Sequence, residues 1–255
     1  MAVHDYLTLI KFRHHFTFLE VLIPAVLFSS LGLLPTLIQV AVTYMCFAVF
    51  LYGGIYTLND IADAEADRRH PLKQLRPLAA RRLTQTSALL FATLLILLGV
   101  GGALLLFSTH VVLLYLAVLA LTTIYTFVGK RIPLIGLLLN SSTHALRPVL
   151  GLLIVHAVHL PMYLFIAYFF FSAGFVAMRW LLLFDFPKNH EPRIPKQRLI
   201  TITIAAFIGM LAILAADWPV HSVIYLTMAG LYTIFVFGIN LSPAIRSFCR
   251  ARVAR

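Results

Sequence analysis

Apolar stretches of roughly 20 residues recur along the whole of this 255-residue chain. Each stretch is long enough to cross a hydrocarbon layer of about 30 Å as a helix. Only 11% of the residues are charged, whereas a soluble domain carries about a quarter. These features exclude a soluble globular enzyme, a disordered chain and a disulfide scaffold, and they predict a polytopic integral membrane protein.

Eight spans are predicted, all of them helical, because an irregular segment cannot satisfy its backbone hydrogen bonds in lipid. The fold class is therefore an all-α membrane bundle, treated as a single polytopic domain over residues 1–255. Two four-helix halves, 1–130 and 131–255, are suggested because in each the second helix runs into a long polar loop that begins with an acid, Asp60 or Asp185. The approximate limits of the spans are 16–35, 37–58, 86–107, 111–129, 133–155, 161–185, 199–216 and 220–241.

The charge balance sets the predicted orientation. The chain has 20 Lys and Arg residues against nine Asp and Glu, an excess that we attribute to loops facing an anionic inner leaflet rather than to a nucleic-acid partner. Apart from Arg147 and Arg179, which fall inside predicted helices, every Lys and Arg lies on one side of the predicted topology. The positive-inside rule then places both termini on the cytoplasmic side, with a bacterial cytoplasmic membrane as the expected location.

An acidic cluster lies at the cytoplasmic end of the second span. Asp60, Asp63 and Asp67 are spaced i, i+3, i+7 and therefore share one helical face, whereas Glu65 points elsewhere. Three stacked carboxylates repel one another unless a cation neutralises them. Hard oxygen ligands without nearby His or Cys suit Mg²⁺, which favours sites shared with substrate phosphates. The cluster predicts a magnesium site with a role in catalysis.

A basic run follows the acids directly. Carboxylates for a divalent ion beside cations for phosphate oxygens form the arrangement that a bound diphosphate requires. The mouth of the site is therefore predicted on the cytoplasmic side. The predicted substrate-binding residues of this run are Arg68, His70, Lys73 and Arg76.

The same residues carry a family resemblance. Asn59-Asp60-x-x-Asp63-x-x-x-Asp67 resembles the first aspartate-rich motif of the UbiA superfamily. The continuation Glu65-Ala66-Asp67-Arg68-x-His70-Pro71-x-Lys73-x-x-Arg76-Pro77 resembles the branch that includes phosphoribosyltransferases acting on polyprenyl phosphate. Lys130-Arg131-x-Pro133 and Leu146-Arg147-Pro148-x-x-Gly151 resemble the fifth-helix region of the superfamily.

The resemblance implies a UbiA-like helical bundle that cuts a Mg²⁺-bound diphosphate from its donor. It implies that Asp60, Asp63 and Asp67 hold the metal, that Asn59 and Lys188 contact substrate, and that Asp185 holds a second metal position. The chain departs from the family pattern in three places: eight spans are expected instead of nine, Asn189 stands where a second acid is expected, and Gly136 replaces an acid near the start of helix five.

Arg147 is the one deep charge, about 14 residues or roughly 20 Å into the predicted fifth helix. A charge at that depth is a functional candidate by default. Arg147 or Lys130 would hold the phosphate of a polyprenyl acceptor. Alternatively, Arg147 would bind a pyrophosphate oxygen, or it would pair with an acid and fix the packing. Glu20 is expected to face Lys11 or Arg13.

The function predicted from these residues is Mg²⁺-dependent transfer from a diphosphate donor involving a polyprenyl lipid. Phosphoribosyl diphosphate is the favoured donor because its extra 5-phosphate needs the additional cations of the basic run. The alternative enzyme transfers a prenyl group from a polyprenyl diphosphate to an aromatic or other small acceptor. A non-enzymatic carrier and an inactive relative are the alternatives from other classes. The oligomeric state is not indicated by the sequence.

Overall fold

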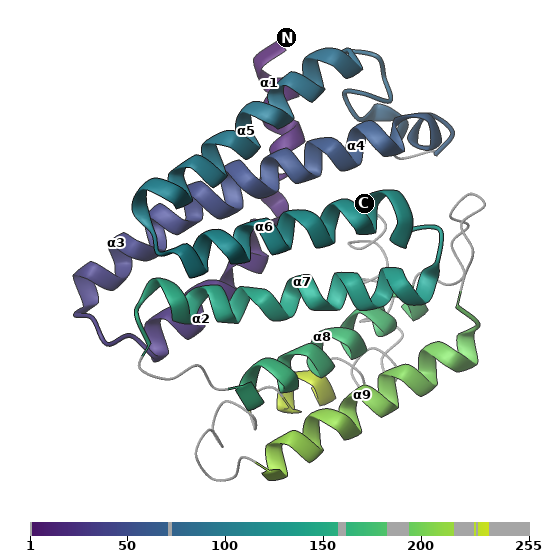
Figure 1. The fold of residues 1–255 in the computed structure, drawn as a ribbon. Helices are drawn as coiled ribbons and strands as arrows, with labels where there is room; N and C mark the ends of the chain where they lie inside the picture. Colours follow the sequence, from purple (N-terminus) through teal and green to yellow (C-terminus); the bar gives the residue numbers. More distant parts are fainter. Residues whose placement is uncertain are drawn as a thin grey trace. The chain divides into compact units, whose positions relative to one another are not determined.

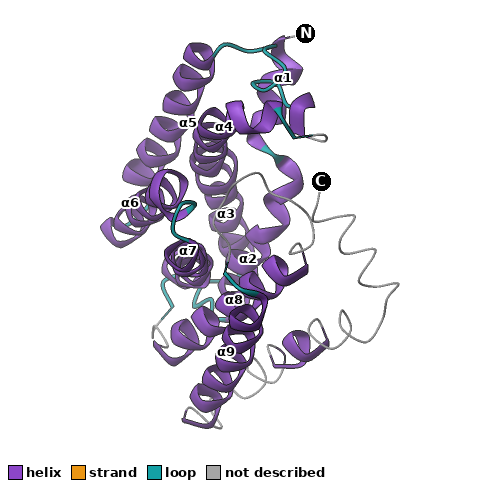
Figure 2. Cartoon of the chain, turned by 90° about the vertical axis from the view of Figure 1, so that its right-hand side faces the viewer, coloured by secondary structure: helices purple, strands orange, loops and turns teal. Residues whose placement is uncertain are grey.

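A computed structural model describes residues 2–70, 73–157, 162–182, 194–216, 227 and 229–234. Every element in these ranges is a helix (Figure 2). The predicted all-α membrane bundle is confirmed, and six helices of the described residues are long and apolar enough to cross a membrane. The eighth predicted span, 220–241, lies largely outside the described residues.

The chain divides into two compact units. The first comprises residues 1–127 and 146–160, and the second comprises 128–145 and 161–255. The chain passes from one unit to the other at 127/128, at 145/146 and at 160/161, and the second of these points lies inside one helix, α7 (Pro133–Ile154), close to Pro148. The predicted repeat of two four-helix halves stays a prediction.

The first unit begins with short helical segments rather than the predicted span 16–35. Helix α1 (Ala2–Ile10) leads into a 3₁₀ helix, η1 (Phe12–Phe18), and then α2 (Leu19–Leu27), which ends before Ser29. Lys11 joins α1 to η1 in a left-handed conformation, and Pro24 lies inside α2. A proline in a helix interior removes a backbone hydrogen bond. The first predicted span is therefore shorter and more broken than its apolar composition indicates.

The second predicted span, 37–58, is longer than expected. Helix α3 (Leu33–Thr43), the π-helical η2 (Tyr44–Leu51) and α4 (Tyr52–Arg68) form one continuous helical run, Leu33–Arg68. Its extension beyond the apolar stretch carries the acidic cluster on regular helix. Figure 1 shows this run beside α5 (Gln85–Leu106), which packs along η2 and α4.

The remaining helices follow the predicted spans closely. In the first unit, α5 is followed by α6 (Thr109–Ile124), which continues into the π-helical η4 (Tyr125–Gly129). Thr84 caps α5 by accepting a hydrogen bond from the Ser87 backbone N–H, which satisfies one of the unpaired donors of the first turn. In the second unit, α8 (Met162–Leu182) and α9 (Lys196–Ala216) pack along each other.

The core of the first unit lies between α2, η2, α6 and the end of α7. Phe47 and Tyr115 are among its largest fully buried side chains, and their rings lie 5.1 Å apart. The second unit has a separate core around Leu137, Ala177 and Leu199. The acidic face of α4 therefore belongs to the first unit, whose packing holds it in place.

Gly151 permits a close helix contact within the first unit. A Cβ atom at this position would lie 2.3 Å from the backbone oxygen of Val21 in α2. One turn earlier on the same face of α7, Arg147 contacts Glu20, the neighbour of Val21. The glycine thus lets α7 approach α2 closely enough for this charged pair to form.

We expect Gly151→Ala to destabilise the protein by about 1–3 kcal/mol, because the added methyl group must displace backbone rather than a mobile side chain. Thermal unfolding of the purified protein in detergent measures the effect. Gly101→Ala is the matched control, since a Cβ there meets nothing within 4 Å. Equal melting temperatures for the two variants would contradict the close contact.

Candidate active site

The predicted acidic face exists on α4. Asp60 and Asp67 are buried, with side chains only 4% and 6% exposed, and Asp63 is half-buried. Glu65 lies elsewhere, with 67% of its side chain exposed, and contacts Arg68 and Arg69. The prediction that the three aspartates share a face without Glu65 is confirmed. Buried carboxylates need charged or hydrogen-bonding partners.

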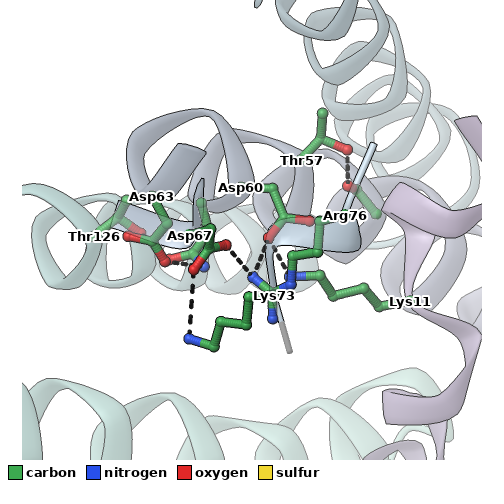
Figure 3. A network of polar contacts seen from close by, with 10 residues as sticks. Lys11, Thr57, Asp60, Asp63, Asp67, Lys73, Arg76 and Thr126 are labelled. Carbon is green, nitrogen blue, oxygen red and sulfur yellow. Dashed lines mark hydrogen bonds and ion pairs between the residues drawn. The ribbon is translucent and has the colours of Figure 1, made fainter. Parts of the chain in front are cut away.

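Three cations provide the partners of the two buried carboxylates (Figure 3). The Lys11 Nζ lies 2.6 Å from Asp60 Oδ1, and the Arg76 Nη1 lies 3.0 Å from the same oxygen. Arg76 also donates to Asp67 Oδ2 at 2.7 Å, and the Lys73 Nζ lies 3.6 Å from Asp67 Oδ1. The Arg76 guanidinium therefore bridges two carboxylates that lie about two helical turns apart on one face of α4. The number of cations at this face, three, equals the number of aspartates.

The third aspartate, Asp63, has a neutral amide as one of its partners. The amide of Asn59 donates from Nδ2 to Asp63 Oδ2 at 3.2 Å. Its own Oδ1 accepts a hydrogen bond of 3.5 Å from Thr126 in η4. Asn59, predicted to be a substrate-binding residue, thus lies beside Asp63 and orients its carboxylate.

Only some residues of the basic run contact the aspartates of α4. Lys73 in η3 (Lys73–Leu75) and Arg76 reach back to α4, as their predicted role requires. Arg68 instead donates to Glu65 at 2.6 Å, away from the three aspartates. His70 accepts a hydrogen bond at Nδ1 from the backbone N–H of Lys73, which orders the turn.

Three other predicted residues cannot be placed against this cluster. Lys130 belongs to the second unit. Asp185 and Lys188 lie outside the described residues. Their predicted roles in metal or substrate binding stay predictions.

Lys11 is the residue that sequence reasoning missed. It lies 49 positions before Asp60, at the junction of α1 and η1. Its ammonium also lies 5.5 Å from the centre of the Tyr56 ring, a cation–π distance. Burial lowers the pKa of Lys11 below its usual value, an effect that Asp60 opposes. In the sequence, Lys11 is a basic residue before the first predicted span, and the positive-inside rule alone accounts for a lysine at that position.

A second buried charge lies further along the same unit. Arg147 Nη1 donates to Glu20 Oε2 at 3.0 Å, and its guanidinium lies 4.8 Å from the centre of the Tyr52 ring. Glu20 therefore pairs with the deep guanidinium of Arg147, a partner that the expectation of Lys11 or Arg13 did not include. The alternative that Arg147 pairs with an acid is confirmed, and this pair fixes α7 against α2.

A small pocket opens beside this pair. Its lining includes buried polar atoms that lack a hydrogen-bond partner among the described residues, the Nε2 of His15 and the hydroxyl of Tyr52. Tyr52, Tyr56 and Asp60 follow one another at i, i+4 and i+8 on α4, so the pocket and the acidic cluster lie along one face of the helix. The lining residues are His14, His15, Thr17, Phe18, Phe47, Ala48, Tyr52, Tyr56 and Arg147.

The donor set of α4 fits Mg²⁺. Carboxylate and amide oxygens are the hard ligands that this ion prefers. Across the described ranges, no three side chains of His, Cys, Asp or Glu are arranged to hold one ion by themselves. Mg²⁺ is usually bound through one or two carboxylates, with water and substrate phosphates as the other ligands. The carboxylates of α4 therefore fit an ion whose other ligands come from outside the protein.

Comparison with proteins of known sequence gives partial matches. A decaprenyl-phosphate phosphoribosyltransferase of Corynebacterium glutamicum is 40% identical over 121 residues, which cover 46% of this chain and 35% of that protein. The enzyme of the same name from Mycobacterium tuberculosis is 32% identical over 109 residues, covering 42% of this chain and 36% of that protein. The matched part of the chain thus spans about a third of the length of these relatives.

Comparison with solved structures covers nearly the whole chain. A UbiA homolog from Archaeoglobus fulgidus, solved with DMAPP and Mg²⁺, superposes with a TM-score of 0.78 at 17% identity. The match covers 98% of this chain and 96% of that one. The same homolog solved with GPP and Mg²⁺ gives a TM-score of 0.76 at 19% identity and the same coverage. These similarities show the fold.

The family assignment rests on the sequence as a whole. The profile of the UbiA prenyltransferase family matches residues 21–252, a range that contains the α4 carboxylates, the basic run and Arg147. The fold comparison agrees with this match over almost every residue. The chain is an integral membrane protein that belongs to the UbiA prenyltransferase family.

Proposed function

We propose that this protein transfers a phosphoribosyl group from phosphoribosyl diphosphate to a polyprenyl phosphate in a Mg²⁺-dependent reaction. The names of its partial relatives from Corynebacterium glutamicum and Mycobacterium tuberculosis support this choice of substrates. The family supports a transferase that releases diphosphate from its donor.

One structural observation carries the proposal. Lys73 and Arg76, which come from the loop after α4, contact the same buried aspartates that would hold the metal ion. Phosphoribosyl diphosphate carries a 5-phosphate in addition to its diphosphate, so its site needs more positive charge than a metal ion alone supplies. With Lys11, the first unit places three cations at this one point.

In the proposed reaction, the bond between the anomeric carbon and the diphosphate oxygen breaks, and its electron pair leaves with the diphosphate. An oxygen of the polyprenyl phosphate forms the new bond to that carbon. Mg²⁺, when bound, neutralises the negative charge that gathers on the leaving group. The ion would take its one or two carboxylate ligands from Asp60, Asp63 and Asp67, and Lys73 and Arg76 would bind the remaining phosphate oxygens and fix the donor's orientation.

We assign the polyprenyl phosphate acceptor to the N-terminal end of the same face of α4, near Tyr52. Arg147 lies in the pocket beside Tyr52, two turns of α4 before Asp60. A guanidinium carries five N–H donors in a planar fork that suits phosphate oxygens. We assign the acceptor's phosphate to Arg147; Lys130 is the alternative ligand predicted from the sequence. A cytoplasmic mouth and a bacterial cytoplasmic membrane remain part of the proposal.

A transfer assay tests the choice of donor. Membranes containing the protein are incubated with Mg²⁺, phosphoribosyl diphosphate labelled in the ribose and a polyprenyl phosphate. A parallel reaction contains a labelled prenyl diphosphate and aromatic acceptors. We expect lipid-extractable label from the ribose donor only, and no label after chelation of Mg²⁺ with EDTA.

Label transferred only from the prenyl donor would contradict the phosphoribosyl assignment and place the protein with prenyltransferases of small acceptors. No transfer from either donor by folded protein would contradict the enzymatic function itself. Both outcomes are informative because one preparation serves both reactions.

A further inference from the structure

Lys11 is held in place more firmly than a surface lysine. Its side chain is 11% exposed, and its Nζ forms the 2.6 Å contact to Asp60 Oδ1. The backbone adopts φ 57° and ψ 51°, a left-handed conformation that non-glycine residues seldom adopt. The sharp change of direction between α1 and η1 therefore aims this lysine at the acidic face of α4.

The position of Lys11 conflicts with a metal ion on the same carboxylate. Asp60 Oδ1 already accepts from both Lys11 and Arg76. A divalent ion bound to this oxygen would lie within a few ångströms of two positive groups, and like charges at that distance repel strongly away from bulk water. Metal binding therefore requires at least one cation to leave Asp60, and a negative ligand must be available to receive it.

The lysine side chain is suited to such a movement. Its ammonium is a compact charge on a flexible four-carbon stem, whereas the Arg76 guanidinium is fixed in a planar bridge between Asp60 and Asp67. The face of Tyr56 lies beside the Lys11 ammonium and stabilises a cation that is displaced from the carboxylate.

We propose that Lys11 is a donor-binding residue that exchanges partners: it neutralises Asp60 before the substrate arrives and contacts a donor phosphate once metal and diphosphate are bound. The proposal rests on the diphosphate chemistry of the proposed function. The exchange makes the binding of metal and donor cooperative, because the metal displaces Lys11 from Asp60 and the donor supplies the phosphate that receives the displaced ammonium. Metal alone then binds weakly, since the resident cation competes with it.

Two opposite effects of one substitution test the exchange. Lys11→Met keeps the length of the side chain and removes its charge. We expect it to strengthen the binding of Mn²⁺ alone about tenfold, because the competing cation is gone, and to weaken the binding of Mg²⁺–pyrophosphate about tenfold, because one charged contact is lost. Free Mn²⁺ is measured by electron paramagnetic resonance, and pyrophosphate binding is measured by titration calorimetry.

Two further variants serve as controls. Lys11→Arg retains the charge and should stay within about threefold of the wild type in both measurements, a difference below 1 kcal/mol. Arg13→Met removes an exposed cation two positions away and should change neither affinity. If Lys11→Met does not fold, Lys11→Gln removes the charge and retains a donor toward Asp60, and it is expected to give the same two opposite shifts.

Affinities that both fall, both rise or both stay unchanged in the charge-removing variant would overturn the exchange. Because pyrophosphate contains neither sugar nor prenyl group, these titrations do not depend on which donor the protein uses. A protein that fails the phosphoribosyl transfer assay can still show the exchange. A protein that passes that assay can equally fail the exchange test.

Discussion

Replacing Asp67 with Asn is expected to lower the rate of transfer on the order of 10³-fold. The carboxylate is almost fully buried, bridges to Arg76 and lies near Lys73. Its removal weakens the metal site and takes one carboxylate partner away from each of Arg76 and Lys73. Metal stabilisation of a leaving group is worth several kcal/mol, which corresponds to a loss of this size. Asp60→Asn should behave alike because it removes the partner of Lys11 and Arg76.

The matched control for these substitutions is Glu65→Gln. Glu65 belongs to the same helix and the same acidic stretch, but it is exposed and contacts Arg68 and Arg69 instead of the cluster. Initial rates at saturating and limiting donor concentration, for all three variants in membranes, give the comparison. An Asp67→Asn variant that is folded and retains a tenth or more of the wild-type rate would contradict the assignment of this face as the active site.

The second large effect concerns stability. Arg147→Met removes the cation that pairs with Glu20 beside the core of the first unit, and breaking a buried ion pair by removing one partner costs about 3–5 kcal/mol. Glu20→Gln should destabilise the protein as well, because the buried guanidinium of Arg147 then loses the carboxylate at 3.0 Å while the Tyr52 ring stays beside it. Reversible unfolding in mixed detergent micelles measures both variants.

The double variant Glu20→Gln/Arg147→Met separates the pair from its surroundings. We expect it to be more stable than Arg147→Met alone, since both charges of the pair are removed together, and the double-mutant cycle gives the coupling between the two residues. If the double variant also regains stability but not transfer activity, Arg147 has a role in binding beyond packing. Additive losses with no coupling would contradict the ion pair as a structural element.

The acidic face is the part of the site that the sequence predicts best. A spacing of i, i+3, i+7 on a helix leaves little freedom, and the structure places Asp60, Asp63 and Asp67 on one side of α4 with Glu65 outside. The contacts of Lys73 and Arg76 were also predictable, because they follow the acids within one short loop. Local sequence is informative here because the site is built from neighbouring segments.

The contributions from distant segments were not predictable in the same way. Lys11 lies before the first predicted span and Glu20 lies in its first turns, yet they contact residues 49 and 127 positions away. Nothing in their local pattern distinguishes a topology-setting lysine or an end-of-helix glutamate from a site residue. Their roles depend on the left-handed turn at Lys11 and on the close approach at Gly151, which tertiary packing decides.

The helix limits show the same division. Hydropathy located α5, α6, α7, α8 and α9 well because each is a long apolar run with polar ends. It ended the second span at 58, although α4 continues to Arg68 as an amphipathic extension. Hydropathy also predicted one span, 16–35, where the structure has the end of η1 and the shorter helix α2. Apolar composition does not reveal the bend at Lys11 or the end of α2 at Leu27.

The most direct measurement is the binding of phosphoribosyl diphosphate to the purified protein as Mg²⁺ is varied, for the wild type and for Asp67→Asn. The α4 cluster predicts binding that requires Mg²⁺ in the wild type and that is lost, or at least a hundredfold weaker, in the variant; a loss of that size is about 2.7 kcal/mol. Equal, Mg²⁺-independent binding by both proteins would contradict a magnesium–diphosphate site on this face of α4.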